Sequence, residues 1–402
     1  MFLFPSLQPE IRLILDSIPA LIDKTFPLPG RFRSSLPADV AELSRLLTSA
    51  RGERSLSYLG RPNLLSAYIR YFLPWNLYRL CRLLPNLDLP LAAGDVITDL
   101  GCGPLTMEAA LWISRPDLRT VPLEFRCVDQ SGPVLDAGKI FFAALSGALS
   151  AALPGRSPWN IHTIKKRIEH PSIREKPAAL VCAVNVCNEV FGDALYSDIN
   201  TQRIKARQAA RFFHSLASPS ASILAVEPGI PGSGQFISLL RSAFLEHQRL
   251  PVSPCPHAAA CPMPGGFSVR DRKRGKNRWC HFAFDTEDAP KVLHKLSAKA
   301  GIPKERAVLC FLLTGPVKAD ALREETMLRV ISDSFPLPEN RFGRYCCSGK
   351  GLVLLTGGKS AIEKSASGAL IAAQFPAEEQ RDAKSGALIV CEGYMPRPLG
   401  RL

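Results

Sequence analysis

The chain has 402 residues, of which 46% are hydrophobic and 21% charged, a composition typical of globular proteins with about two or three domains. The net charge of +14 favours an anionic partner such as nucleic acid. The N-terminus lacks a basic segment before its apolar residues, and no apolar run reaches about 18 residues, so we expect neither a secretory signal nor a membrane partner. Twelve cysteines in such a chain indicate a reducing, cytoplasmic location rather than a disulfide framework. We also expect a monomer.

Residues 1–90 are predicted to be mostly helical, because PEIRLILDSIPALIDKTF and DVAELSRLLTSA repeat apolar residues every three or four positions. The stretch that follows them mixes aromatic residues with arginines. These side chains can stack on bases and pair with phosphates, or they can belong to an amphipathic helix pair with inward aromatics. The residues are Tyr58, Tyr68, Tyr71, Trp75 and Tyr78 with Arg61, Arg70, Arg79 and Arg82.

Residues 91–250 are predicted to form an α/β domain, because short β-branched runs alternate there with helical patterns. This alternation is typical of a doubly wound parallel sheet. The expected strands are VITDL, LEFRCVD, IHTIKKRI, AALVCAVNVCN and ASILAVEPG.

Residues 251–356 are predicted to form a small β-rich domain that carries a group of cysteines, and residues 357–402 a C-terminal tail. One helix is expected in APKVLHKLSAKAG. The strand-like runs are AVLCFLLTG, LRVISDSFPLP, RYCCSGKGLVLLTG and GALIVCEGY, the last of them in the tail. The glycine- and serine-rich residues 357–386 are expected to be helical or mobile.

A glycine loop follows the first predicted strand of the α/β domain, in VITDLGCGPLT. Gly101 and Gly103 allow a ligand to approach the backbone where a helix begins, and Asp129, at the end of the next strand, suits ribose hydroxyls. The run starting at Asp99 resembles the first motif of S-adenosylmethionine-dependent methyltransferases, E/D-x-G-x-G-x-G. Leu105 replaces the third glycine of that motif, so we expect it to crowd the methionine end of the cofactor.

No catalytic residue can be assigned from the sequence. The D/N-P-P-Y/F tetrad of enzymes that methylate base amines is not matched by NVCNE after the fourth predicted strand. Cys187 lies there without an evident activating base. Asn188 is a candidate for the cofactor and substrate side, because ligands gather at the carboxyl ends of parallel strands.

The stretch PCPHAAACPMPGGFSVRDRKRGKNRWCHF is predicted to hold a metal centre. Five residues separate Cys255 from Cys261, and eighteen separate Cys261 from Cys280, unlike the shorter spacing of zinc knuckles. Thiolates select zinc, copper(I) or iron–sulfur clusters, and Cys-Pro also occurs in ferredoxins, so iron–sulfur, zinc and no metal stay open, in that order. The candidates for a fourth ligand are Cys346 and Cys347, followed by His257 and His281.

Several segments together resemble the methyltransferase-like family of the mitochondrial small ribosomal subunit and its bacterial relatives. The resemblance runs from about Tyr58 to Leu355, and its most specific parts are V-E-P-G-x-P-G and the cysteine stretch. The matching segments are YLGRPNLLSAYIRYFL, DLGCGPLT, NVCNEV, VEPGIPGSGQFISLLRSAF, PCPHAAACP and WCHF.

This resemblance implies a Rossmann-like class I methyltransferase sheet that binds S-adenosylmethionine and a 4Fe–4S cluster and acts in small-subunit assembly. Cys255, Cys261 and Cys280 correspond to the first three cluster ligands, and Cys347 is favoured over Cys346 as the fourth. The alternatives are an active rRNA methyltransferase and a zinc-stabilised RNA-binding protein with a vestigial cofactor pocket.

A basic run lies inside the cysteine stretch. It is either a solvated loop or a surface that grips the phosphates of ribosomal RNA. Its residues are Arg270, Arg272, Lys273, Arg274, Lys276 and Arg278.

Overall fold

The computed structural model describes residues 2–48, 58–150, 158–168, 176–192, 195, 197–263, 279–316 and 326–391. The chain divides into two compact units. The N-terminal unit comprises Pro5–Val184 and Asp285–Ala307. The C-terminal unit comprises Met1–Phe4, Asn185–Phe284 and Val308–Leu402.

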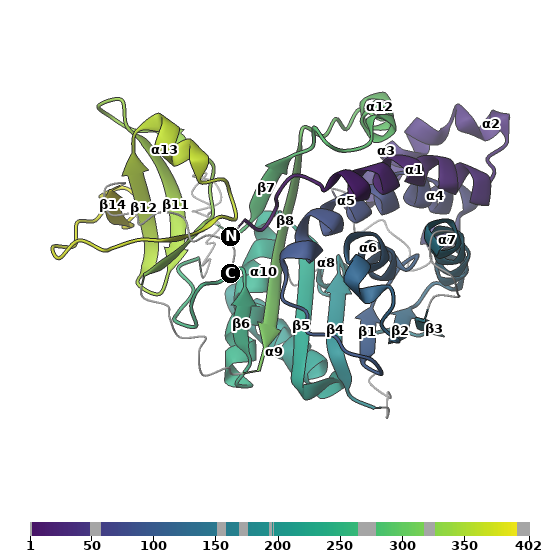
Figure 1. The fold of residues 1–402 in the computed structure, drawn as a ribbon, viewed down its shortest axis with the longest axis horizontal. Helices are drawn as coiled ribbons and strands as arrows, with labels where there is room; N and C mark the ends of the chain where they lie inside the picture. Colours follow the sequence, from purple (N-terminus) through teal and green to yellow (C-terminus); the bar gives the residue numbers. More distant parts are fainter. Residues whose placement is uncertain are drawn as a thin grey trace. The chain divides into compact units, whose positions relative to one another are not determined.

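Four parallel strands form the sheet of the N-terminal unit, in the order β3-β2-β1-β4 (Figure 1). All five residues of β1 are buried, as expected for a parallel strand with both faces covered. The chain runs outward from β1 to β3 and then returns to the other side of β1, so the carboxyl ends of β1 and β4 form a topological switch point, where ligands bind in such sheets. The bounds are β1 Val96–Leu100, β2 Glu124–Asp129, β3 Asn160–Lys165 and β4 Ala178–Val184.

The helices of the N-terminal unit follow the predicted apolar periodicity. In α1, Pro9 opens the helix, Glu10 lies in the first turn and Lys24 in the last, which suits the helix dipole. Helices α1, α5, α6 and α7 pack against one another (Figure 1). The bounds are α1 Pro9–Thr25, α2 Gly30–Arg33, α3 Leu36–Leu47, α4 Pro62–Ala67, a π-helical turn Tyr68–Phe72, α5 Leu73–Leu83, α6 Thr106–Ser114, α7 Gly132–Ser150 and α12 Lys291–Lys299. Short 3-10 turns cover Tyr58–Gly60, Leu84–Asn86 and Pro116–Leu118.

One stretch of the described residues, Gly132–Leu149 in α7, is long and apolar enough to cross a membrane. The core helix of a water-soluble protein passes the same test of length and composition. Helix α7 packs against α1, α6 and the strands β2 and β3, as a core helix does. The expected absence of a membrane partner stays a prediction.

The first part of the C-terminal unit is a β5-β8-β6 arrangement, in which β8 runs antiparallel to both neighbours and also pairs with β7. The run AVLCFLLTG, which the sequence grouped with the late strands, forms β8 here because its residues are apolar and nearly all buried. Helices α9 and α10 pack together and against β5. The bounds are α8 Cys187–Val190, α9 Ile199–Leu216, β5 Ala217–Pro228, α10 Pro231–Glu246, β6 Leu250–Ser253, β7 Phe282–Asp285 and β8 Arg306–Gly315.

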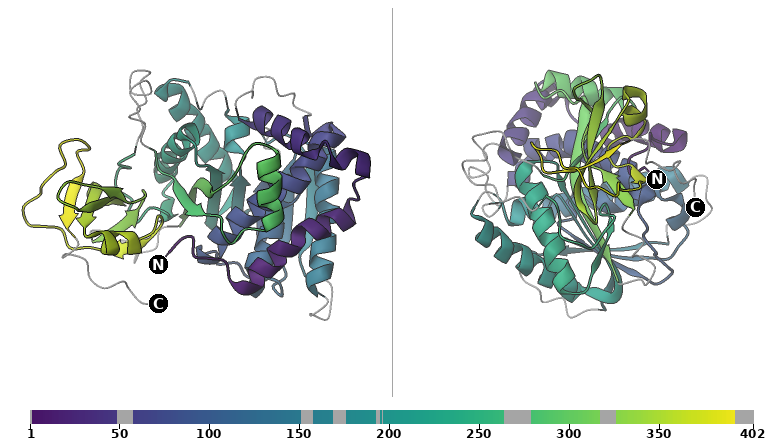
Figure 2. Two further views of the ribbon diagram at one scale, coloured as in Figure 1. Left: turned by 90° about the horizontal axis from the view of Figure 1, so that it is seen from above. Right: turned by 90° about the vertical axis from the view of Figure 1, so that its left-hand side faces the viewer.

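The C-terminal unit also holds a second sheet, in the order β13-β9-β11-β12-β14, with β10 on β11. Its strands are drawn in yellow-green to yellow in Figure 2. Strands β11 and β12 form a hairpin in which Ser348 pairs with Gly351, and the positive φ of 101° at Gly351 suits glycine. The bounds are β9 Met327–Val330, β10 Phe335–Pro336, β11 Phe342–Ser348, β12 Gly351–Gly357, α13 Lys359–Lys364, β13 Leu370–Ala372 and β14 Leu388–Cys391. The predicted fold class, α/β with an N-terminal helical region and a β-rich region late in the chain, is confirmed.

Candidate functional site

The glycine loop lies between β1 and α6 in the N-terminal unit. Gly101 and Gly103 have φ of 65° and 56°, a conformation that glycine adopts without strain. The Asp129 carboxylate holds the loop, since it accepts from the Gly103 amide at 3.1 Å and from the Ser131 amide at 2.8 Å. A carboxylate has about four lone-pair sites, so Asp129 can still accept a ribose hydroxyl while it fixes the loop.

Leu105, at the position of the motif's third glycine, has a left-handed backbone with φ of 56°. Its side chain is fully buried. It lies beside Gly138 of α7, where an added Cβ would be 2.9 Å from Leu105 Cγ and 2.6 Å from the Pro104 carbonyl carbon. The side chain therefore packs in the core against α7, and the backbone carries a strain of about 1–2 kcal/mol.

The Asp99 side chain is buried rather than exposed beside the glycine loop, and it forms a cluster with Glu108 of α6. Cys182 Sγ donates to Asp99 Oδ1 at 3.5 Å, and Cys127 Sγ donates to Glu108 Oε1 at 3.0 Å. Burial raises the pKa of both carboxyls, and the Glu108 charge raises that of Asp99 further. The sequence interpretation missed Glu108, although a lone acid in the apolar helix MEAALWIS is a visible signal.

Asn188, the remaining candidate for the cofactor side, belongs to the C-terminal unit. Its backbone amide donates to Glu227 Oε2 at 3.0 Å, and the Cys187 amide donates to Glu227 Oε1 at 2.7 Å. Glu227, in the V-E-P-G segment, thus organises the start of α8. Burial raises its pKa to about 7.

The candidate metal ligands come together in the C-terminal unit. Cys255, Cys261 and Cys280 are partly buried, and the pKa values of Cys280 and Cys347 are raised by burial and by the nearby Cys255 and Cys261. Alternation along β11 separates the two candidates for a fourth ligand. Cys347 faces this group, whereas Cys346 lies in the apolar core with Leu328 and Val353.

Two buried arginines, Arg241 of α10 and Arg329 of β9, hold the backbone of residues 254–261, which we call the cysteine loop. Each donates two hydrogen bonds to carbonyl oxygens, and their charges act on the Cys255 and Cys280 thiols, lowering their pKa values against the larger effect of burial. The sequence interpretation did not single them out, because each stands alone in an apolar run. The bonds join Arg241 to His257 O at 2.7 Å and Ala259 O at 2.8 Å, and Arg329 to Pro254 O at 2.7 Å and Gly368 O at 2.8 Å.

His257 lies next to Cys347, with its Nε2 atom 3.0 Å from Cys347 Sγ. Burial and the Arg241 charge lower its pKa to about 4, so the imidazole is neutral at pH 7. A neutral imidazole can orient the Cys347 thiol or serve as a ligand. Within the described residues, however, no three Cys, His, Asp or Glu side chains are placed to hold one metal ion.

Trp279 and Cys280 are fixed by the segment that follows β5. Trp279 Nε1 donates to Gly229 O at 2.9 Å. An added Cβ at Gly234 of α10 would lie 2.6 Å from Trp279 Cδ1 and 2.9 Å from Cys280 O, so α10 can approach Cys280 only where it has a glycine. V-E-P-G-x-P-G and W-C-H therefore belong to one packed structure.

The aromatic stretch of the N-terminal unit favours the interpretation as an inward-packed helix pair. Tyr58, Tyr71, Trp75 and Tyr78 are all buried, so they do not form an open platform for bases. The six basic residues from Arg270 to Arg278 lie outside the described residues, and their contact with RNA stays a prediction.

Comparisons with known proteins give one family match, over residues 201–333, to the model described as mitochondrial small ribosomal subunit Rsm22. No curated protein sequence matches the chain.

Among solved structures, the chain is similar to a protein from Thermoplasma acidophilum assigned as a methyltransferase, with 10% identity, 57% of this chain and 71% of that one covered, and a TM-score of 0.32. A protein from Listeria monocytogenes assigned as a class I S-adenosylmethionine-dependent methyltransferase is 10% identical, with 77% of this chain and 88% of that one covered and a TM-score of 0.33. A protein from Galdieria sulphuraria assigned as a sarcosine dimethylglycine methyltransferase is 11% identical, with 69% of this chain and 98% of that one covered and a TM-score of 0.29. Likenesses of this size do not identify a substrate. The resemblance to the small-ribosomal-subunit family is confirmed over residues 201–333.

Proposed function

We propose that this protein is a small-ribosomal-subunit assembly factor of methyltransferase fold, which binds S-adenosylmethionine, one 4Fe–4S cluster and ribosomal RNA. We further propose that it acts in the cytoplasm as a monomer. The observation that carries the proposal is the gathering of Cys255, Cys261, Cys280 and Cys347 around two buried arginines, with three of the four cysteines inside the segment that matches the ribosomal family.

The donor set fits an iron–sulfur cluster better than a single zinc ion. Structural zinc draws its ligands toward one tetrahedral point and usually takes them from cysteines two to four residues apart, unlike the longer spacing here. In a 4Fe–4S cluster each of four cysteines binds its own iron, so the sulfurs need not converge on one point. Arg241 and Arg329 would balance the negative charge of four thiolates. When bound, the cluster would tie the cysteine loop to β11 and so stabilise the fold.

The glycine loop supports S-adenosylmethionine as the second cofactor. Gly101 and Gly103 leave the backbone free of side chains, and Asp129 offers an acceptor for ribose hydroxyls. The Leu105 side chain packs against α7, which favours a second candidate function, an active rRNA methyltransferase. Transfer of a labelled methyl group from the cofactor to small-subunit RNA distinguishes this candidate from an assembly factor without turnover.

Protein purified without oxygen tests the cluster. It is expected to be brown, with broad absorption near about 400 nm and iron in place of zinc. Cys255→Ser is expected to lose the colour. Cys346→Ser is the matched control, because Cys346 lies in the apolar core and its loss leaves the ligands unchanged. Colourless protein with one zinc per chain would refute the cluster in favour of the zinc-stabilised alternative.

A further inference from the structure

Four arginines in the helical segment between Arg61 and Arg82 differ in their partners. Three form ion pairs with carboxylates. Among the described residues, Arg79 has no such partner: one of its terminal nitrogens, Nη1, donates to Asn76 Oδ1 at 2.8 Å, and its Nε is buried without a hydrogen bond. The three pairs are Arg61 with Glu42 at 3.0 Å, Arg70 with Asp23 at 3.5 Å, and Arg82 with Asp288 at 2.8 Å.

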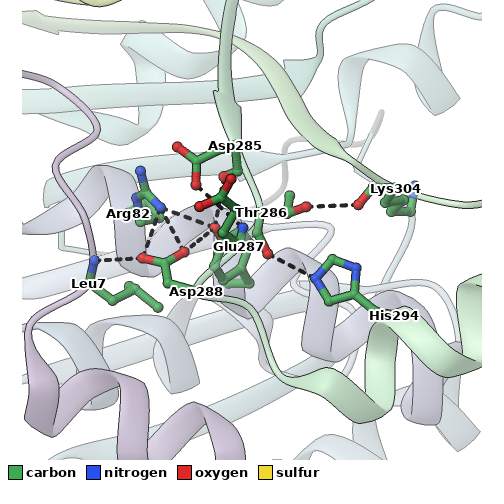
Figure 3. A network of polar contacts seen from close by, with 9 residues as sticks. Leu7, Arg82, Asp285, Thr286, Glu287, Asp288, His294 and Lys304 are labelled. Carbon is green, nitrogen blue, oxygen red and sulfur yellow. Dashed lines mark hydrogen bonds and ion pairs between the residues drawn. The ribbon is translucent and has the colours of Figure 1, made fainter.

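Lys304 lies against the same helix face as Arg79. Tyr71, Trp75 and Arg79 are spaced four residues apart, which aligns them on one side of the helix. Lys304 Nζ is 6.0 Å from the ring centroids of both Tyr71 and Trp75. The Lys304 backbone is anchored, because its carbonyl accepts from Thr286 Oγ1 at 2.7 Å in the network of Figure 3.

Among the described residues, neither Arg79 nor Lys304 forms an ion pair with a carboxylate. Asp288 is directed at Arg82 and the Leu7 amide (Figure 3) and also accepts from the Tyr78 hydroxyl, so it pairs with Arg82 and not with Arg79. Burial and the Arg79 charge lower the pKa of Lys304 to about 8, and burial lowers that of Arg79. Aromatic rings offset only part of the cost of burying two like charges.

The cation pair belongs to the same unit as the glycine loop and is linked to it by Tyr68. The Tyr68 hydroxyl lies 3.7 Å from the position of a Cβ added at Gly103, and the Tyr68 phenol raises the pKa of Arg79. An oxyanion at this point would supply a negative charge that the described residues do not place beside Arg79 and Lys304. A phosphate suits the pair better than a carboxylate, because it offers three oxygens to a forked guanidinium and a point charge together.

We propose that Arg79 and Lys304 form a binding site for a phosphate group of a nucleotide or of the RNA backbone, beside the glycine loop. Arg79 would hold phosphate oxygens through its terminal nitrogens, since its Nε atom is buried, and Lys304 would add a single charged contact. Only the identity of the RNA rests on the proposed function, because inorganic phosphate tests the site without any RNA.

The test measures how fast acetic anhydride modifies Lys304 in the full chain at pH 7.5, by mass spectrometry. Only the neutral amine reacts, and the lowered pKa of Lys304 leaves part of its amine neutral at pH 7.5, so Lys304 is expected to react. Inorganic phosphate is expected to slow the reaction about tenfold for each unit by which it raises the Lys304 pKa. In Arg79→Gln this protection is expected to disappear. Arg61→Gln, which removes an exposed arginine already paired with Glu42, is expected to keep it.

Two other outcomes overturn the proposal. Protection by S-adenosylhomocysteine but not by phosphate would assign the pair to the cofactor carboxylate, and protection by neither would remove the anion site. A melting-temperature assay guards against misfolding of Arg79→Gln: phosphate is expected to raise the melting temperature of the unmodified chain but not that of Lys304→Gln. Failure to associate with small-subunit RNA, with phosphate protection retained, would refute the proposed function and leave this site standing.

Discussion

The glycine loop and the cysteine loop are both irregular backbone segments held by polar side chains, but the side chains differ: carboxyl groups at the first and arginines at the second. Carboxyl groups surround the glycine loop: Asp129 accepts from the loop amides, and Asp99 and Glu108 lie buried beneath it. Arginines surround the cysteine loop, where Arg241 and Arg329 donate to its carbonyl oxygens.

This difference in charge matches the ligands proposed for the two loops. S-adenosylmethionine brings ribose hydroxyls, which are hydrogen-bond donors that the Asp129 carboxylate can accept. Four thiolates with a cluster bring negative charge, which guanidinium groups balance. The predictions below separate these electrostatic roles from simple packing.

The largest effect is expected from Arg329→Met. The substitution leaves the buried carbonyls of Pro254 and Gly368 without their charged donor. Two such bonds correspond to about 3–6 kcal/mol in the free energy of unfolding. Because Arg329 would also balance the negative charge of the proposed cluster and its thiolates, the iron content per chain is expected to fall. Urea unfolding and iron analysis of anaerobic protein measure the two effects.

Arg344→Met is the matched control for Arg329→Met. Arg344 is likewise buried in the second sheet and donates to two carbonyls, Ile362 O at 2.9 Å and Ser332 O at 2.9 Å, but it lies on the side of Cys346. A comparable loss of stability with unchanged iron content is expected. Equal iron loss in both variants would mean that Arg329 acts only through the fold.

The next largest effect is the pH dependence of the free energy of unfolding that arises from the buried Glu108 carboxyl group. Burial raises the pKa of Glu108 to about 7, against an unfolded value of about 4.3. Between these values the folded chain keeps a proton that the unfolded chain has lost, so the free energy of unfolding falls as pH rises from about 4.3 to 7, by up to about 4 kcal/mol. Glu108→Gln is expected to flatten this slope in urea titrations at pH 5 and pH 8.

Glu246→Gln is the control for the pH measurement, since Glu246 is an exposed partner of Arg207 at 2.8 Å and its removal should leave the slope unchanged. Glu227 keeps its own contribution, because its pKa is also raised to about 7 by burial. A slope that Glu108→Gln leaves intact would contradict the assignment of this buried proton to Glu108.

Local patterns in the sequence predicted most elements of the fold, because apolar periodicity and turn residues act over short distances. VITDL, LEFRCVD and the helices of residues 1–90 illustrate this. The position of β8 could not be predicted in this way, since an apolar run does not state which strand it pairs with. The sequence also identified the glycines and cysteines, whose spacing is unusual.

The supporting residues were harder to predict than the ligands they support. Arg241, Arg329 and Glu108 each stand alone in apolar segments, and only folding shows what they contact. Cys346 and Cys347 are adjacent in the sequence, and they are distinguished only because their side chains point to opposite faces of β11. Long-range pairing of buried charges leaves no periodic signal in the sequence.

The smallest effect, about 1 kcal/mol, tests the strain at Leu105. Leu105→Ala removes buried packing against α7 at a cost of about 2–5 kcal/mol. Leu105→Gly removes the same packing but relaxes the left-handed backbone, so it is expected to be more stable than Leu105→Ala by about 1 kcal/mol. Urea unfolding of the two variants measures the difference.

Leu111, fully buried in the regular part of α6, is the control position, where the alanine variant is expected to be more stable than the glycine variant. There glycine costs about 1 kcal/mol more than alanine, because it adds backbone freedom to the unfolded chain and relieves no strain. An inverted order at Leu105 alone would show that the glycine loop keeps a leucine against its backbone preference for the sake of packing on α7. If alanine is more stable than glycine at both positions, the glycine loop holds leucine without backbone strain. The glycine loop and the cysteine loop would then differ only in the charged groups that contact them.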